Sequence, residues 1–405
     1  MPSRDPVPVS RDPLPATVKA LGWTSFLTDL SSEAIYPLLP AFVRSIGGTS
    51  LDIGLIDGVA NAVAALVRLV SGALSDKIGR RPLVLLGYGL SSVVRPLTAL
   101  AASPLHVILV RAADRFGKGI RSAPRDALVT DLVVPDQRGR AFGHIRGLDH
   151  AGAAVGPLAA MLFLLVCPGQ ERTLFLLTVL PGLATLAVIW RFVRDPPRHA
   201  TAPRPLAARL SRPQCWLLGS VAVWSLGAAS EQFLLLRAAE LGTPIAFLPL
   251  VWFAMSFAKG AAATRAGGLS DTVSPRRVLV GGWLLFALAY GLLAAADSLA
   301  LALPLIIVVG VAYGLAEPAE RTLVATLAPT GTHGAAFGWY ALVQGLMALP
   351  AGLLAGALWD QGPAGSSWSF GASALLATAA CGLLAALPLN GVRESARITS
   401  GVMNS

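Results

Sequence analysis

Charged residues are scarce in this chain of 405 residues. Aspartate, glutamate, lysine and arginine together make up 13% of it, whereas hydrophobic residues make up 54%. Soluble globular proteins carry about 25% charged residues, so this composition excludes an ordinary soluble domain. It is typical of a protein that crosses a membrane many times. The 41 glycines and 29 prolines agree, because membrane helices tolerate both residues.

Cysteine and histidine are also scarce. Three cysteines, Cys167, Cys215 and Cys381, lie far apart in the sequence, and there are five histidines. They predict neither a disulfide framework nor a soft-metal site, and no nucleophile is paired with a base at a usable spacing. We therefore expect no enzyme activity, no bound metal and no cofactor. The net charge of +10 fits cytoplasmic loops of a membrane protein better than nucleic-acid binding.

Long apolar runs fill most of the chain. About 20 apolar residues cross a bilayer as a helix, and the sequence holds twelve runs of about this length. They are 18–43, 51–74, 83–101, 105–130, 142–166, 173–193, 215–237, 244–266, 278–296, 301–327, 335–358 and 370–389. We predict an all-α membrane protein of twelve transmembrane helices. The expected parts are a tail at 1–17, six helices in 18–193, a basic linker at 194–214, six helices in 215–389 and a tail at 390–405.

Lysine and arginine are distributed unevenly between the predicted spans. If the N-terminus is cytoplasmic, only Arg44, Arg172 and Arg237 fall in outer loops, and the cytoplasmic segments hold far more cations. Cytoplasmic loops carry the excess of positive charge in membrane proteins. We therefore expect both termini and the linker in the cytoplasm, and the chain in the inner (plasma) membrane.

Two loops repeat each other. "GALSDKIGRRPLVLLG" (72–87) aligns without gaps with "GGLSDTVSPRRVLVGG" (267–282), at an offset of 195 residues. The same offset relates "GRAFG" (139–143) to "GAAFG" (334–338). The chain is therefore predicted to be two pseudo-symmetric six-helix bundles in parallel repeat. Such an architecture places the substrate site between the halves, near the middle of the bilayer.

The first copy of this loop resembles the loop signature of the major facilitator superfamily (MFS). The resemblance extends to the twelve spans, the central linker and the repeated loop, and it implies the MFS fold and transport by alternating access. It also implies a cytoplasmic gate made of Gly72, Asp76, Lys77, Gly79, Arg80, Arg81, Asp271 and Arg276. The alternative is that these residues make only a tight polar turn that fixes orientation. Thr272, Ser274 and Pro275 depart from the signature, so we expect the second loop to close less tightly.

The fourth predicted span carries more charge than a lipid-facing helix tolerates. An arc of about 140° on this helix contains Arg111, Asp114, Arg115, Lys118, Arg121, Arg125 and Asp126. A charge at the centre of a membrane helix costs roughly 2.5–3.5 kcal/mol, so this face must meet an aqueous cavity or partners on other helices. We expect the four residues from Arg111 to Lys118 to face the cavity. Arg121, Arg125, Asp126 and Asp131 are candidates for the inner end of the span, where side chains snorkel or pair with the loop after the second span. We expect this role for Arg125 and Asp126 in particular.

Two carboxylates interrupt the first apolar run, in "TDLSSEAIYPLLP" (28–40). Asp29, Glu33, Tyr36 and Pro40 share one face of a helix. A proton-coupling acid must protonate near neutral pH, and by position Asp29 and Glu33 both qualify. The alternative is that "DLSSE" starts a helix, with Asp29 or Ser31 as the N-cap. The run also resembles the first span of a bacterial efflux group within the superfamily.

Glutamate recurs after a serine in the seventh span, at Ser230-Glu231. We expect Glu33 and Glu231 to form a pseudo-symmetric pair of acids. In the fifth span, Asp149 is a candidate partner for the fourth-span cations and a further proton-coupling candidate. Arg68 and Arg95 are possible partners that neutralise acids of the first half.

Other intramembrane residues are candidates for the substrate cavity, because ionisable groups in membrane helices are functional hypotheses by default. They are Lys259 and Glu317, whereas Glu320 and Arg321 are assigned to a polar end near the inner surface. Trp252 and Trp339 are candidate aromatic lining, although ordinary packing explains such residues too. In the fifth span, small residues (Gly147, Gly152 and Gly156) provide a face for close helix packing. This face partly resembles the fifth-span signature of antiporters.

Together these features favour a secondary active transporter. We expect proton antiport that exports a small solute and confers resistance, with the proton gradient as the energy source. The expected partners are a small-molecule substrate, protons and the lipid bilayer, with no nucleic acid and a monomeric chain. An uptake symporter for a small organic anion stays open because the fourth span has an excess of cations. A resistance exporter for a metal or metalloid stays open as well.

Overall fold

The structure is a computed structural model that describes residues 13–134, 137–195, 210–228, 230–272, 274–328 and 333–386. Within these ranges, the side chains of 72–73, 76–77, 138–139, 267–272 and 333–334 are not described. Every element of secondary structure in the described ranges is a helix, as predicted.

The helices follow the predicted spans closely. The first part of the chain contains α1 (Ala16–Ile35), η1 (Tyr36–Leu38), α2 (Leu39–Ser45), α3 (Ser50–Ile78), α4 (Arg80–Val94), η2 (Arg95–Leu100), α5 (Pro104–Leu132), α6 (Arg138–Val166), α7 (Glu171–Leu177) and α8 (Val179–Phe192). The second part contains α9 (Arg212–Gly227), α10 (Gln232–Glu240), η4 (Ile245–Phe247), α11 (Leu248–Thr272), α12 (Pro275–Leu293), α13 (Leu299–Leu327), α14 (His333–Trp359) and α15 (Gly365–Ala385).

The "DLSSE" segment lies inside a continuous helix. α1 runs from Ala16 to Ile35 and turns into the short 3-10 helix η1 at Tyr36. Pro37 and Pro40 explain this change, because a proline has no N–H to continue the hydrogen-bond ladder. The alternative in which Asp29 or Ser31 caps a helix start is therefore wrong.

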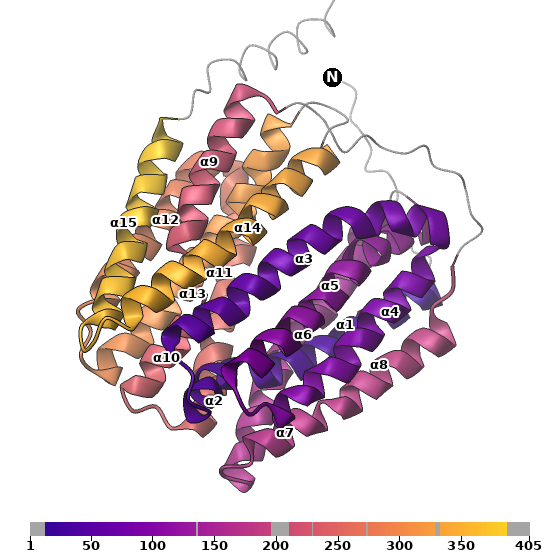
Figure 1. The fold of residues 1–405 in the computed structure, drawn as a ribbon. Helices are drawn as coiled ribbons and strands as arrows, with labels where there is room; N and C mark the ends of the chain where they lie inside the picture. Colours follow the sequence, from indigo (N-terminus) through magenta and orange to yellow (C-terminus); the bar gives the residue numbers. More distant parts are fainter. Residues whose placement is uncertain are drawn as a thin grey trace, which may run out of the picture. The chain divides into compact units, whose positions relative to one another are not determined.

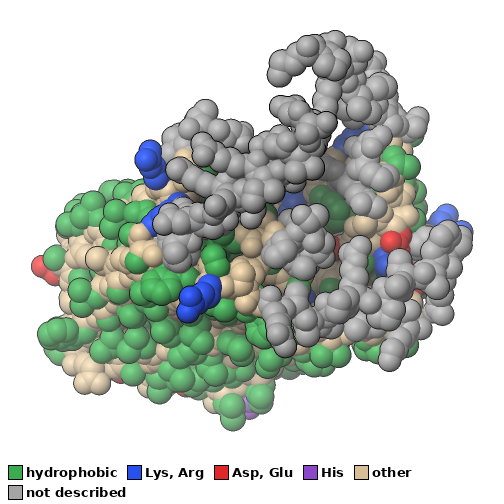
Figure 2. All heavy atoms as spheres, turned by 90° about the horizontal axis from the view of Figure 1, so that it is seen from above, with side chains coloured by type: hydrophobic (Ala, Val, Ile, Leu, Met, Phe, Trp, Pro, Cys, Tyr) green, Lys and Arg blue, Asp and Glu red, His purple; other side chains and the backbone are tan. Residues whose placement is uncertain are grey.

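Nine helical segments of the described residues are long and apolar enough to cross a membrane. They match nine of the predicted spans, and the first, fourth and seventh are the three without a counterpart. The first is polar and interrupted by η1, the seventh is interrupted after Gly227, and α5 carries the charged residues. The total of twelve spans therefore stays a prediction. The face shown in Figure 2 is largely hydrophobic, with few charged side chains among the described residues.

By its internal packing the chain divides into two units. The first is Met1–Gly47, Val63–Pro203 and Ile245–Phe253, and the second is Gly48–Ala62, Arg204–Pro244 and Ala254–Ser405. α3 and α11 are each divided between the units. The predicted tails (1–17 and 390–405) and the linker (194–214) lie largely outside the described residues, so their cytoplasmic location stays a prediction.

Helix packing in the two units follows the sequence repeat. In the first unit, α1 packs on α6 and α8, and α4 packs on α5 and α8 (Figure 1). In the second, α9 packs on α14 and α15, and α12 packs on α13 and α15. Single contacts repeat at the same offset of 195. The guanidinium of Arg81 donates to the carbonyl of Trp190, and that of Arg276 donates to the carbonyl of Ala385.

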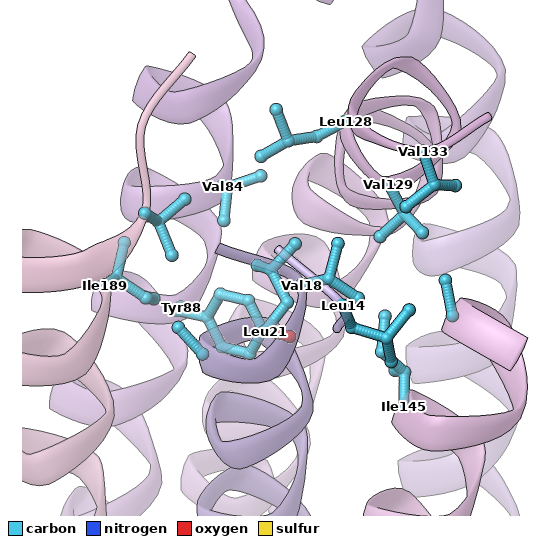
Figure 3. Close-up of a cluster of buried hydrophobic side chains, with 13 residues drawn as sticks. Leu14, Val18, Leu21, Val84, Tyr88, Leu128, Val129, Val133, Ile145 and Ile189 are labelled. Atoms are coloured by element: carbon cyan, nitrogen blue, oxygen red, sulfur yellow. The ribbon is translucent and has the colours of Figure 1, made fainter. Parts of the chain in front are cut away.

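A buried apolar cluster holds the first unit together where α1 begins (Figure 3). It joins the start of α1 to α4, α5, α6 and α8 through Leu14, Val18, Leu21, Val84, Tyr88, Leu128, Val129, Val133, Ile145 and Ile189. Burying a side chain of this size contributes about 1.5–3 kcal/mol. Through this cluster, the apolar side chains at the end of α5 pack against the neighbouring helices, next to the charged face of α5.

Two glycines of α6 bring its backbone against α1. A Cβ atom built on Gly152 would lie 2.3 Å from the carbonyl oxygen of Phe26, and one on Gly156 would lie 2.6 Å from that of Leu30. At Gly147 a Cβ atom meets nothing within 4 Å. The predicted small-residue face is therefore confirmed for Gly152 and Gly156, and Gly147 is not part of it.

Gly152→Ala is expected to destabilise the protein by about 1–3 kcal/mol, because the methyl group meets backbone that has no room to move. Gly147→Ala is the matched control, and a gain of up to about 1 kcal/mol is expected there from helix propensity. The measurement is thermal unfolding of both purified variants in detergent. Equal stability of the two variants would contradict the close α1–α6 contact.

Candidate functional site

The charged face of α5 is turned into the first unit. Arg111, Asp114 and Arg121 are buried, with at most 6% of their surface exposed, whereas Phe116 on the other side is 43% exposed. Arg115, Lys118, Arg125 and Asp126 are half-buried. The prediction that these charges meet other helices rather than lipid is confirmed for the three buried residues.

Arg95 and Asp114 form the centre of this face. The guanidinium of Arg95 donates to Asp114 Oδ1 at 2.9 Å, to the carbonyl of Thr28 at 3.0 Å and to the hydroxyl of Ser31. Arg111 lies 3.7 Å from the other oxygen of Asp114. The expectation that Arg95 neutralises an acid of the first half is therefore confirmed. This pair ties α1 and η2 to α5, and each carboxyl oxygen of Asp114 has a guanidinium group nearby.

The inner part of α5 makes further polar contacts. Arg121 donates to the hydroxyl of Ser91 at 2.7 Å, and its guanidinium lies 4.4 Å from the ring centre of Tyr88. Arg125 pairs with Asp126 at 3.1 Å and also donates to Ser25 on α1 at 3.1 Å.

The pairing expected between the inner end of the fourth span and the loop after the second is made by Asp131, whereas Arg125 and Asp126 pair with each other. Asp131 at the end of α5 pairs with Arg80.

Glu33, Tyr36, Trp252 and Arg111 lie together, although 219 residues separate Glu33 from Trp252. Trp252 belongs to the segment Ile245–Phe253 that packs with the first unit. Its indole N–H donates to Glu33 Oε2 at 2.8 Å, and its ring lies 4.7 Å from that of Tyr36. The guanidinium of Arg111 lies 5.5 Å from the ring of Tyr36. Four predicted site residues thus form one aromatic and charged cluster, which we call the Glu33 cluster.

Asp29 lies one helical turn before Glu33 and is half-buried. It interacts electrostatically with Lys118 and Asp149, and Lys118 also interacts with Glu33. The ion pair that Asp149 makes is with Arg146 on its own helix, at 3.4 Å. In the described part of the chain, neither Asp29 nor Glu33 has a cation at ion-pair distance.

The predicted gate residues fall partly outside the described residues. Gly72, Asp76, Lys77 and Asp271 lie outside the residues whose side chains the structure describes. Gly79 starts α4 with φ of 100°, a conformation that favours glycine. Arg81 donates its backbone N–H to Asp195 at 2.8 Å. These contacts fit a tight polar turn as well as a gate, so the gating role stays a prediction.

In the second unit, Glu231 stands at the start of α10, after the interruption that follows Gly227. Lys259 on α11 lies 3.4 Å from Glu231, and its amine lies 5.0 Å from the ring centre of Tyr313. Glu33 instead lies inside α1, three residues before that helix changes to η1. The two acids thus stand near a break in the first span of each half, and their pairing in function stays a prediction.

Sequence reasoning missed Asp57 on α3. This acid is 6% exposed and accepts a hydrogen bond from Ser230 at 2.5 Å. Asp57 lies in the stretch "DIGLIDG", close to Asp52, which is an ordinary cap residue at the start of α3. The local sequence pattern did not distinguish the two acids.

The structure corrects the placement of Glu320, whereas the cavity roles of Glu317 and Trp339 stay predictions. Glu320 was expected at a polar helix end, but its side chain is buried, with 3% exposed, in a hydrogen-bonded cluster. Glu317 is exposed and pairs with Arg321 at 3.1 Å. Trp339 is 38% exposed. Glu320 is therefore the acid at the centre of a buried polar cluster at this part of α13 and α14.

The first unit brings acidic, basic and aromatic side chains together in the Glu33 cluster. Among the described residues, no group of three His, Cys, Asp or Glu side chains could hold a metal ion. The Glu33 cluster offers one carboxylate, two aromatic rings and one guanidinium. Such a set can bind an amphipathic solute through ring contacts and charge.

Comparison with known proteins agrees with the fold. The sequence profile described as Major Facilitator Superfamily matches residues 21–237. An uncharacterized MFS-type transporter of Methanocaldococcus jannaschii is 32% identical over 372 residues, covering 86% of this chain and 90% of that protein. The multidrug resistance protein MdtH of Aeromonas hydrophila is 29% identical over 347 residues, covering 84% and 87%.

Solved structures give the same fold. A bacterial homolog of the human lysosomal transporter Spinster has a TM-score of 0.75 at 16% identity, covering 91% of this chain and 95% of that one. The nucleoside transporter NupG has a TM-score of 0.74 at 12% identity, covering 90% and 99%. With a profile match over more than half of its length, the chain belongs to the Major Facilitator Superfamily of transporters.

Proposed function

We propose that this MFS transporter exports a small amphipathic solute in exchange for protons, and that Glu33 is the group for which proton and solute compete. The name of the MdtH relatives supports export of drug-like compounds. Exchange requires that one site hold the proton or the solute, but not both, and a carboxylate beside an aromatic surface meets this requirement.

The observation that carries the proposal is the difference between Glu33 and Asp114. Asp114 is held by Arg95 at 2.9 Å and by Arg111 at 3.7 Å, so its charge is already balanced. Glu33 accepts a neutral indole N–H from Trp252 and has no ion pair among the described residues. An acid without a fixed counter-ion can exchange its proton for a cationic group of the solute.

A second candidate function is uptake of a small organic anion by proton symport. It is favoured by the cations of the first unit, because Arg111, Arg115 and Lys118 lie on the same helix face, with Asp114 as the acid between them. The two functions differ in the direction in which the solute moves.

Accumulation measurements separate the two functions. An efflux-deficient host expressing the chain is screened against a broad panel of toxic compounds, and cell-associated compound is measured for each hit. Export lowers accumulation relative to the empty vector, and a protonophore that collapses the proton gradient restores it. Higher accumulation in expressing cells would favour symport. A protonophore without effect on any exported compound would contradict proton coupling.

A further inference from the structure

Glu320 occupies a buried polar cluster that the proposed function does not use. Trp283 on α12 donates its indole N–H to Glu320 Oε1 at 3.1 Å. On the other oxygen, the hydroxyl of Tyr340 donates to Oε2 at 2.5 Å and the amide of Gln344 donates to it at 3.3 Å. Trp283, Glu320 and Tyr340 are at most 4% exposed, whereas Gln344 is half-buried. Three helices thus converge on one carboxyl group.

All three donors to Glu320 are neutral. Besides these hydrogen-bond donors, the groups that act on it electrostatically are Glu317 and Arg321. Arg321 is directed to Glu317 at 3.1 Å, so this exposed pair is neutralised locally. An ionised carboxylate that is buried without a paired cation is costly. The cluster therefore supplies hydrogen bonds to Glu320 without the charge that would fix it in the ionised form.

The helices that pack against α13 carry other charged and titratable groups in the described residues, and several of these groups bind partners other than Glu320. These groups are Arg212 and Cys215 on α9, Arg237 and Glu240 on α10, Lys259 and Arg265 on α11, and Arg276, Arg277 and Tyr290 on α12. Lys259 pairs with Glu231, Arg237 pairs with Glu240, and Arg276 binds the carbonyl of Ala385. None of these groups forms an ion pair with Glu320 among the described residues.

Glu320 can keep its hydrogen bond with Tyr340 in both protonation states. A tyrosine hydroxyl has one donor and two acceptor lone pairs. When Glu320 is ionised, the hydroxyl of Tyr340 donates to Oε2. When Oε2 carries a proton, it can donate to the same hydroxyl, which already accepts from Gln344 at 2.9 Å. Gln344 is the half-buried end of this chain of hydrogen bonds.

The repeat shows that this position is specialised in the second unit. At the offset of 195, Glu320 corresponds to Arg125 and Trp283 corresponds to Tyr88. Arg125 is paired with Asp126 at 3.1 Å, so the charge in the first unit is balanced by an acid. In the second unit the charged residue has the opposite sign and only neutral donors around it.

We propose that Glu320 is a proton-binding site of the second unit. The proton comes from water, adds to Oε2 of the carboxylate and returns to water when the carboxyl group ionises again, with Gln344 as the half-buried end of the cluster. During this step the hydroxyl of Tyr340 changes from donor to acceptor. That the bound proton also contributes to export rests on the proposed function, whereas proton binding itself does not.

Infrared difference spectroscopy on the full chain in liposomes tests the proposal without any substrate. Spectra are compared between about pH 5 and pH 9, and the C=O band of protonated carboxyl groups is followed. Glu320→Gln is expected to remove one component of this band from the difference spectrum. Glu240→Gln is the matched control, because Glu240 also accepts an indole N–H, from Trp359 at 3.0 Å, but lies beside Arg237. This control is expected to keep the component.

Tyr340→Phe is a second variant that does not depend on removing the acid. It is expected to shift the Glu320 component to higher frequency, because the carboxyl group loses one hydrogen bond. An unchanged spectrum in Glu320→Gln, or a Glu320 band that is the same at both pH values, would overturn the proposal. The component is also expected to persist in Glu33→Gln. If it persists while export proves independent of protons, only the coupling role fails.

Discussion

Glu33→Gln is expected to abolish proton-driven export, with loss of resistance to every compound that the wild-type chain exports. Glutamine keeps the size of the side chain and can still accept the indole N–H of Trp252 through its amide oxygen. It cannot take up or release a proton. Glutamine resembles the protonated form of Glu33, so the variant should bind solutes weakly and fail to exchange them for protons.

The measurement is growth of an efflux-deficient host at graded concentrations of an exported compound, with the amount of membrane-inserted protein determined in parallel. Asp297→Asn is the matched control, because Asp297 is an exposed acid between α12 and α13. It should protect as well as the wild type. Full protection by Glu33→Gln at equal expression would show that another group carries the exchanged proton.

Trp252→Phe separates the hydrogen bond from the ring contact in the same cluster. Phenylalanine keeps an aromatic ring beside Tyr36, which lies 4.7 Å from Trp252, but it has no N–H for Glu33. A loss of about one net hydrogen bond to a charged group corresponds to roughly 1.5–3 kcal/mol. We expect the pH at which export is half-maximal to change in this variant, whereas solute binding at a fixed pH changes less.

The charged face of α5 could be predicted from the sequence because helical periodicity is local. Residues from Arg111 to Arg121 recur every three or four positions, and lipid cannot accommodate such a face. Long-range partners are different. Nothing near Trp252 in the sequence indicates that its indole reaches Glu33, because that contact depends on how α11 packs.

The sequence also could not predict which individual acids are buried. Glu317 and Glu320 are three residues apart on α13, and both stand near Pro318 in the same polar stretch. Which of them faces the helices around it depends on the rotation of α13 against α12 and α14. Helical periodicity gives the angle between the two side chains around α13, but it does not say which of them points toward α12 and α14. The sequence analysis therefore favoured Glu317, which is exposed.

Arg95→Met is expected to destabilise the protein by about 3–5 kcal/mol, because it leaves the carboxylate of Asp114 buried with only part of its counter-charge. The lost contacts include the ion pair at 2.9 Å and the bond to the carbonyl of Thr28 at 3.0 Å. Methionine fills much of the same volume, so the effect reports charge rather than a cavity. Thermal unfolding of the purified protein in detergent, followed by intrinsic fluorescence, measures it.

A double-mutant cycle shows whether the pair or the single residues matter. Asp114→Asn alone should also be strongly destabilising, since it leaves Arg95 and Arg111 without the acid between them. The double variant should lose less than the sum of the two, with a coupling of about 0.5–3 kcal/mol. The exposed pair of Glu317 and Arg321 is the comparison, and breaking it should cost no more than about 1 kcal/mol. Equal effects for the two pairs would mean that Arg95 and Asp114 are solvated in the protein, and α5 would then lack the fixed charge that distinguishes Asp114 from Glu33.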